Sequence, residues 1–292
     1  MDDNFFDFSP ARVAELAQTD AARALREDAG DGDLTAGLVP AGGHATARVL
    51  LREPAVLCGA PWVEAVVRQL DPQARIVWHG AEGTQCAAEQ TVLEISGDAR
   101  ALLTAERTAL NFLQLLSAVA TRTATYVEAV RGTRAAIVDT RKTLPGLRLA
   151  QKYAVRVGGG TNHRIGLYDA ILIKENHIAA AGGVSAALQA AARVAGQAKF
   201  VEIEVETLDQ LDEALAQGAR MVLLDNMDLP TLREAVRRNE AAGKTRAVLE
   251  ISGGVTLESV RALAETGVDR ISVGALTKDI KAIDFSMRFQ EG

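Results

Sequence analysis

Two patterns of hydrophobic and polar positions divide the chain. In the first part, segments with helical periodicity alternate irregularly with short apolar, β-branched runs. Pro54 interrupts the longest of these runs and predicts a bend or a sheet edge there, because proline has no N–H to donate to a neighbouring strand. Helices are therefore expected over 9–27, 61–70 and 99–130, and strands over 47–58, 75–78 and 91–95.

A regular alternation of strands and helices begins near residue 135. Helical segments separate short apolar strands, which is typical of a parallel sheet covered on both faces. The expected strands cover 136–139, 170–174, 200–206, 220–225, 247–252 and 270–275. A closed or nearly closed barrel and a doubly wound open sheet both fit this pattern. Polar residues at the strand ends favour the barrel, and the lack of a G-x-G-x-x-G after the first strand weakens a dinucleotide-binding interpretation.

The composition excludes several classes of protein. The 292 residues are 48% hydrophobic and 24% charged, so the chain is too apolar to be disordered. The net charge of −6 argues against a general nucleic-acid-binding protein. The most apolar stretch, 109–120, contains polar residues and is too short to span a bilayer. The acidic N-terminus indicates no signal peptide, and the two cysteines are expected as free thiols, so we expect a cytoplasmic protein.

Charge is distributed unevenly along the chain. Nine Lys or Arg and only two acids lie between residues 131 and 174. A basic segment in an acidic protein suggests an anionic ligand. Arg148, Lys152 and Arg156 are four residues apart and are expected to form an exposed helical stripe. The candidates for ligand binding lie instead at strand ends or in loops, and they are Arg141, Lys142, His163, Arg164 and Lys174.

Two glycine-containing turns follow the last two expected strands. They are Ser252-Gly253-Gly254 and Ser272-Val273-Gly274-Ala275. In barrel enzymes the loops after the final strands often bind phosphate through backbone N–H groups, and glycine lets the backbone approach the anion. Either turn alone is also explained as a tight connection, but two successive ones favour a phosphate site.

Carboxylates mark two of the middle strands. Glu202 and Glu204 alternate with apolar residues, so both face the same side of their strand. Asp225 ends the next strand and is expected to converge with Glu204. Two carboxylates near a phosphate site suggest Mg²⁺ binding, or stabilisation of positive charge in a transition state. Structural pairing of these acids with the basic loops is the alternative.

Several longer segments occur in order along the chain: EDAGDGDLT (27–35), ERTALNFLQ (106–114), DTRKTLPGLR (139–148), GGGTNHRIGLYD (158–169), IKENH (173–177), VEIEVE (201–206), LLDN (223–226), EISGG (250–254) and ISVGALT (271–277). Together they resemble the quinolinate phosphoribosyltransferase family, also called nicotinate-nucleotide pyrophosphorylase (carboxylating). The resemblance implies an α/β fold with two domains. An N-terminal α/β sandwich over 1–115, joined by the tail 280–292, would precede an incomplete, open α/β barrel of parallel strands over 116–279. It also implies a homodimer or a higher homo-oligomer whose active sites are shared between subunits.

The resemblance further implies a reaction and a set of site residues. The family converts quinolinate and phosphoribosyl pyrophosphate to nicotinate mononucleotide, pyrophosphate and CO₂ in NAD biosynthesis, with Mg²⁺ as cofactor. By resemblance, Lys142, Glu204 and Asp225 would be catalytic, with Glu204 and Asp225 near the metal, and Arg107 would enter the partner subunit's site. The quinolinate carboxylates would be held by Arg141, His163, Arg164 and Lys174, and the 5′-phosphate by Ser252, Gly253, Gly254, Ser272 and Gly274.

Two alternatives stay open at this point. A related phosphoribosyltransferase of the same fold could act on another anionic aromatic compound. A non-catalytic protein that binds phosphorylated sugars would keep the glycine turns, but it would not need Glu204 and Asp225 together.

Overall fold

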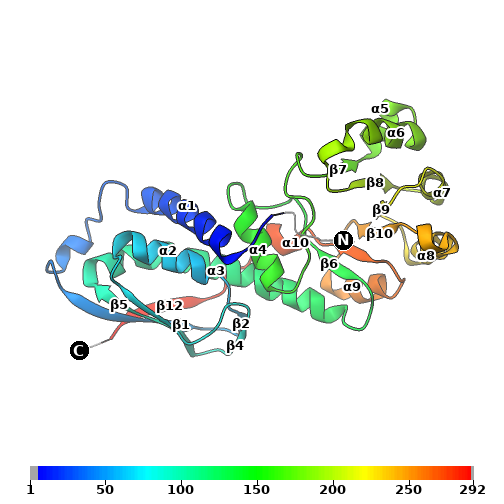
Figure 1. The fold of residues 1–292 in the computed structure, drawn as a ribbon. Helices are drawn as coiled ribbons and strands as arrows, with labels where there is room; N and C mark the ends of the chain where they lie inside the picture. The colour runs from blue at the N-terminus through cyan, green and yellow to red at the C-terminus, as the bar shows by residue number, and fades with distance from the viewer. Residues whose placement is uncertain (1–5, 291–292) are drawn as a thin grey trace. The chain divides into compact units, whose positions relative to one another are not determined.

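The computed structural model describes residues 6–290, and the contacts among them form two compact units (Figure 1). The N-terminal unit comprises Asp7–Ala124, Leu144–Gly159 and the tail from Asp279 onward. The barrel unit comprises Thr125–Thr143 and Gly160–Lys278.

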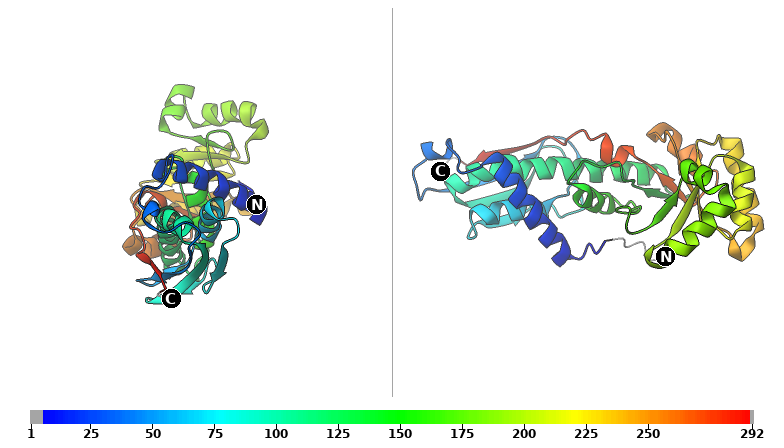
Figure 2. Two further views of the ribbon diagram at one scale, coloured as in Figure 1. Left: turned by 90° about the vertical axis from the view of Figure 1, so that its left-hand side faces the viewer. Right: turned by 90° about the horizontal axis from the view of Figure 1, so that it is seen from above.

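The N-terminal unit is an α/β sandwich, as expected. Its antiparallel sheet has the strand order β12-β1-β5-β3, and its helices lie together on one side of that sheet (Figures 1 and 2). The strands are β1 (His44–Leu51), β3 (Arg75–Trp78), β5 (Gln90–Asp98) and β12 (Phe285–Phe289), and the helices are α1 (Pro10–Asp28), α2 (Ala60–Leu70) and most of α3 (Ala99–Ala129), with the 3₁₀ turn η1 (Ala36–Leu38). Because β12 pairs with β1, the C-terminal tail forms an edge of this sheet.

Pro54 separates two pieces of the strand predicted over 47–58. β1 ends at Leu51, and a short new strand, β2 (Ala55–Val56), pairs with β4 (Gln85–Cys86) instead of with the main sheet. The predicted interruption is thus confirmed. Cys58 and Cys86 are both buried free thiols, and burial raises the pKa of Cys58.

Helix α4 (Arg148–Val157) differs from its prediction in two ways. The resemblance implies that residues 144–159 belong to the barrel domain, whereas the contacts of the structure group them with the N-terminal unit, where the Tyr153 ring lies 5.4 Å from that of Trp62. The exposed stripe predicted for this helix is wrong. Lys152 is completely buried, whereas Arg156 is exposed. Protein therefore covers the middle of the face that helical spacing alone suggested was free, at Lys152, and leaves Arg156 exposed.

The barrel unit contains a parallel sheet with the order β6-β11-β10-β9-β8-β7. Its strands are β6 (Ala136–Val138), β7 (Ile171–Ile173), β8 (Val201–Val205), β9 (Met221–Asp225), β10 (Val248–Ser252) and β11 (Arg270–Ser272), each inside its predicted range. Among the described residues no pairing joins the edge strands β6 and β7, so the barrel is open. This confirms the expected fold class.

Helices cover the outside of this sheet (Figure 1). They are α5 (Glu175–Ala181), α6 (Val184–Val194), α7 (Leu208–Ala216), α8 (Leu229–Ala241) and α9 (Leu257–Ala264), with 3₁₀ turns η2 (Ala195–Gln197) and η3 (Gly243–Thr245). The short helix α10 (Ala275–Lys278) follows β11. Side chains such as Ile203, Val222 and Leu249 are fully buried, which explains why the strands are continuous apolar runs. Because the strands are parallel, their carboxyl ends meet at one edge, where barrel enzymes place their active sites. Over the described part of the chain, none of the helices combines the length and hydrophobicity that crossing a bilayer requires.

Candidate active site

A cavity of about 310 Å³ lies at the carboxyl ends of the barrel strands. Most of the residues predicted to bind ligand line it, namely Arg141, Lys142, His163, Arg164, Lys174, Glu204, Ser252 and Ser272. A larger cavity of about 520 Å³ lies within the N-terminal unit. That cavity is lined by Asp20, Glu27 and Asp28 but only one cation, Arg23, so it does not suit a polyanion.

Two buried aspartates form hydrogen bonds that hold the segment carrying His163 and Arg164 in its conformation. Asp139 accepts a hydrogen bond from the side-chain amide of Asn162 at 2.7 Å and another from the backbone N–H of His163 at 2.8 Å. Asp169 accepts two backbone N–H groups of the same segment, at 2.7 and 2.9 Å. These are the two acids of the basic segment, and sequence reasoning gave them no role. Their carboxylates hold the loop so that its cations meet at the cavity.

Positive charge is crowded inside the cavity. Arg164 is buried, and its guanidinium donates to the carbonyl of Ala170 at 3.1 Å. Burial and the neighbouring Arg141 lower the pKa of Arg164, while the carboxylates of Asp169 and Glu202 oppose that change. An anionic ligand bound beside Arg164 would add negative charge and so favour the charged form of its guanidinium.

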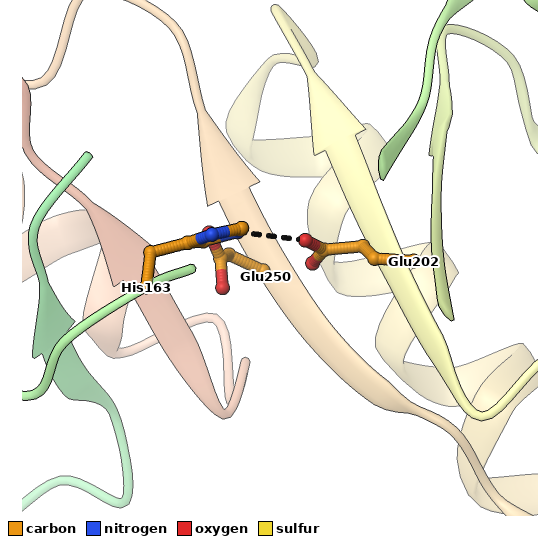
Figure 3. A group of neighbouring side chains, drawn as sticks. All are labelled: His163, Glu202 and Glu250. Atoms are coloured by element: carbon orange, nitrogen blue, oxygen red, sulfur yellow. Dashed lines mark hydrogen bonds and ion pairs between the residues drawn. The ribbon is translucent and has the colours of Figure 1, made fainter. Parts of the chain in front are cut away.

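His163 lines the cavity, but both of its ring nitrogens bind to the protein. Nε2 lies 2.8 Å from Oε2 of Glu202 and 3.7 Å from Oε1 of Glu250 (Figure 3). Nδ1 accepts the backbone N–H of Arg164 at 2.8 Å, which places a ring proton on Nε2, toward Glu202. Burial alone lowers the pKa of His163, but Glu250 and Glu202 outweigh it and raise the pKa above its ordinary value.

Beneath the cavity, Glu202 and Glu250 are completely buried, and both lie close to the His163 ring. The Nε atom of Arg270 lies 2.8 Å from Glu250, and the hydroxyl of Ser272 donates to the same carboxylate. Burial and the nearby Glu250 raise the pKa of Glu202, against the hydrogen bond from His163. Sequence reasoning missed Glu250 and Arg270. Glu250 interrupts an apolar strand just as Glu202 does, and that shared feature could have identified the pair.

A second acidic group lies at the mouth of the cavity. Lys174 donates from Nζ to Oε2 of Glu204 at 3.1 Å. Burial raises the pKa of Glu204, the ion pair with Lys174 opposes this, and the charges of Asp225 and Glu175 add to it. Glu204 and Asp225 are therefore close enough to interact electrostatically.

The two candidate metal positions differ in chemistry. Magnesium usually keeps several waters and is bound by one or two carboxylates together with substrate phosphates. Glu204 and the partly exposed Asp225 fit an ion that arrives with a pyrophosphate group. The ligand atoms of His163, Glu202 and Glu250 also lie within 4.8 Å of one another. There, however, a ring N–H and a guanidinium already balance the carboxylates, so that buried group does not fit a metal.

The glycine turns require glycine. Gly253 and Gly254 have φ angles of +100° and +56°, a region that other residues rarely adopt. At Gly274 an added Cβ would lie 3.2 Å from the side chain of Lys142, so that side chain would have to move slightly to admit a larger residue. Arg107, the remaining predicted residue, is exposed on α3 in the N-terminal unit.

Two family models together match most of the chain. Residues 33–117 match the family described as "Quinolinate phosphoribosyl transferase, N-terminal domain", and residues 119–288 match the corresponding C-terminal domain. The chain is 44% identical over 280 residues to a nicotinate-nucleotide pyrophosphorylase [carboxylating] of Mycobacterium leprae, covering 94% of this chain and 97% of that protein. It is 41% identical to a probable enzyme of the same name from Bacillus subtilis, over 89% of each chain. The structure of the nicotinate-nucleotide pyrophosphorylase from Francisella tularensis superimposes with a TM-score of 0.89 at 43% identity, covering 95% of this chain and 97% of that one.

Proposed function

Because the chain belongs to the quinolinate phosphoribosyltransferase family, we propose that it transfers the phosphoribosyl group of phosphoribosyl pyrophosphate to quinolinate with decarboxylation. The products are nicotinate mononucleotide, pyrophosphate and CO₂, and the reaction is a step of NAD biosynthesis. The chain is thus an enzyme of the pentosyltransferase class. One observation of the structure supports this function above the others: cations from three separate segments line one cavity, beside two glycine turns.

The cations suit a small aromatic dicarboxylate. Arg141 and Arg164 offer planar guanidinium groups, which bind carboxylates through paired hydrogen bonds, and Lys174 adds a point charge. Lys174 is also paired with Glu204, so a bound carboxylate would share this ammonium with the protein. His163 would contribute mainly by shaping the pocket, because both ring nitrogens already have protein partners.

The turns and carboxylates suit a sugar phosphate. Ser252, Gly253 and Gly254 would hold the 5′-phosphate through backbone N–H groups, and Gly274 would complete the seat with Ser272 beside it. Lys142 lies against Gly274 and lines the cavity, which supports a role for its ammonium between the phosphate turn and the dicarboxylate pocket.

The bonding changes follow from this placement. The C1–O bond of the ribose breaks and pyrophosphate leaves with the electron pair, while the pyridine nitrogen forms a new bond to C1. Glu204 and Asp225 stabilise the positive charge that develops on the sugar. The electrons of the bond to the 2-carboxylate stay on C2, where the adjacent ring nitrogen, now positive, stabilises them. CO₂ departs, and a proton from solvent takes its place on the ring.

Three further features belong to the same proposal. Mg²⁺, when bound, would neutralise charge on the leaving pyrophosphate, and Glu204 and Asp225 would hold it directly or through water. The enzyme would act as a homodimer or higher homo-oligomer in the cytoplasm. Arg107, exposed on α3, would reach the site of a partner subunit.

Release of labelled CO₂ from quinolinate that is labelled at its 2-carboxylate tests the function. We expect release only when phosphoribosyl pyrophosphate and Mg²⁺ are both present. Nicotinate, which lacks the 2-carboxylate, should be a poor acceptor. Conversion of nicotinate without quinolinate activity would indicate a related transferase, and binding of ribose 5-phosphate without any turnover would indicate a sugar-phosphate sensor.

A further inference from the structure

Asn226, directly after β9, has a left-handed backbone. Its φ angle is +52°, and Glu89 is the only other non-glycine residue within 6–290 that has a positive φ. Such a conformation is tolerated by asparagine but is unfavourable compared with glycine. The side chain of Asn226 is exposed, so packing in the core does not explain why asparagine is used here.

The amide of Asn226 connects two turns of the site. Its Nδ2 donates to Oδ2 of Asp225 at 2.8 Å. Its Oδ1 lies so close to Gly253 that a Cβ added there would be 2.3 Å away. The backbone N–H of Asn226 also reaches the carbonyl of Ser252 at 3.4 Å, and Asp225 and Ser252 are paired in the parallel ladder of β9 and β10. One side chain therefore contacts both the carboxylate and the glycine turn.

We propose that Asn226 is a positioning residue for the phosphoribosyl substrate. Its amide fixes the rotation of the Asp225 carboxylate and fits against the turn of residues 252–254. The left-handed backbone is what aims the amide at both partners. This inference rests on the proposed function, since it takes Asp225 and the turn as the seat of the sugar phosphate.

The proposal predicts a difference between the two substrates. Asn226 touches the groups assigned to the sugar phosphate, whereas the dicarboxylate pocket is built by Arg141 and Arg164 from other segments. Loss of the amide should weaken binding of the phosphoribosyl substrate and leave that of quinolinate unchanged. A merely structural residue would affect both substrates together, along with thermal stability.

Replacement by glycine separates these effects. Asn226→Gly keeps the left-handed backbone without strain, so the melting temperature should hold or rise. We expect KM for phosphoribosyl pyrophosphate, and Kd for ribose 5-phosphate measured by calorimetry, to rise about tenfold, the effect of one hydrogen bond to a charged group. KM for quinolinate should not change. Asn226→Asp should weaken ribose 5-phosphate binding at least as much, because a second carboxylate repels Asp225.

The matched control is Glu89→Gly, at the other left-handed position, which should leave both KM values and the ribose 5-phosphate affinity unchanged. The proposal is overturned if Asn226→Gly leaves ribose 5-phosphate affinity unchanged, or raises both KM values together while lowering the melting temperature. Failure of the proposed function is a separate result, because it appears as a wild-type enzyme that releases no labelled CO₂. Ribose 5-phosphate binding needs no turnover and still tests Asn226 in that case.

Discussion

Replacing Glu202 tests the buried acid pair beneath the active site. Glu202→Gln keeps the shape of the side chain and an oxygen that can accept the Nε2–H of His163. It also removes a negative charge that is completely buried beside Glu250. Glu202→Ala instead leaves the imidazole N–H without its acceptor and opens a cavity.

The two variants should differ strongly in stability. Removing one partner of a buried charged pair costs about 3–5 kcal/mol, which is the loss expected for Glu202→Ala. For Glu202→Gln, the weaker hydrogen bond to His163 is offset by relief of burial and of repulsion from Glu250. We therefore expect a net loss of about 1 kcal/mol or less near neutral pH.

The pH dependence has a definite sign. The pKa of Glu202 is raised in the folded state, so its ionisation favours unfolding, and stability is lost as pH rises above the ordinary pKa of a glutamate. The raised pKa of His163 acts in the same direction, because its contribution is present below its ordinary pKa and is lost as pH rises through the folded value. Glu202→Gln removes the first effect and weakens the second. The wild type should therefore lose more stability than this variant between about pH 5 and pH 8.

Urea unfolding at several pH values measures these differences. Circular dichroism follows the whole chain, whereas tryptophan fluorescence reports on the N-terminal unit, because Trp62 and Trp78 both lie there. The Glu202 substitutions should shift the midpoint of the unfolding transition that circular dichroism records. Equal losses for the Gln and Ala variants, or parallel pH profiles for wild type and Glu202→Gln, would refute this account of the pair.

Three other predictions address the site and its surroundings. Lys142→Ala should lower kcat/KM by at least about tenfold, while the exposed control Lys244→Ala leaves it unchanged; equal values would remove Lys142 from the mechanism. Gly253→Ala should abolish ribose 5-phosphate binding in calorimetry, because the new Cβ would lie 2.3 Å from an amide oxygen and φ is +100°; retained affinity would contradict the phosphate assignment. Arg246→Ala breaks a two-point ion pair with Asp269, and should cost about 1 kcal/mol in urea unfolding without altering either KM.

The fold of the barrel could be predicted because each of its strands shows the same local pattern of apolar residues. Buried parallel strands are continuous apolar runs, and Met221 to Leu224 shows this plainly, since all of these residues are buried. Helical spacing is less informative. It correctly groups Lys152 with Arg148 and Arg156 on one face, but it does not tell what covers that face. The burial of Lys152 depends on tertiary contacts that the spacing of charges does not encode.

The same limit applies to the candidate site. Residue types and strand ends were enough to collect Arg141, Arg164 and Lys174 at one cavity. The orientation of the His163 ring could not be derived in this way. It depends on the hydrogen bonds of Nε2 with Glu202 and of Nδ1 with the backbone N–H of Arg164. Glu250 lies 3.7 Å from the same Nε2 atom, and Arg270 lies beside Glu250.

The crowded cations of the site favour the binding of an anion, but bringing them together disfavours folding. Burial and Arg141 disfavour the charged form of Arg164, and Asp169 and Glu202 compensate from the protein side of the cavity. His163 shares the Glu202 carboxylate through its Nε2 and so limits how much negative charge faces the arginines. A dianion that enters from the open side therefore meets cations that the protein holds in place. Its binding should stabilise the barrel unit, because a ligand that binds only the folded state raises the free energy of unfolding with the logarithm of its concentration divided by Kd.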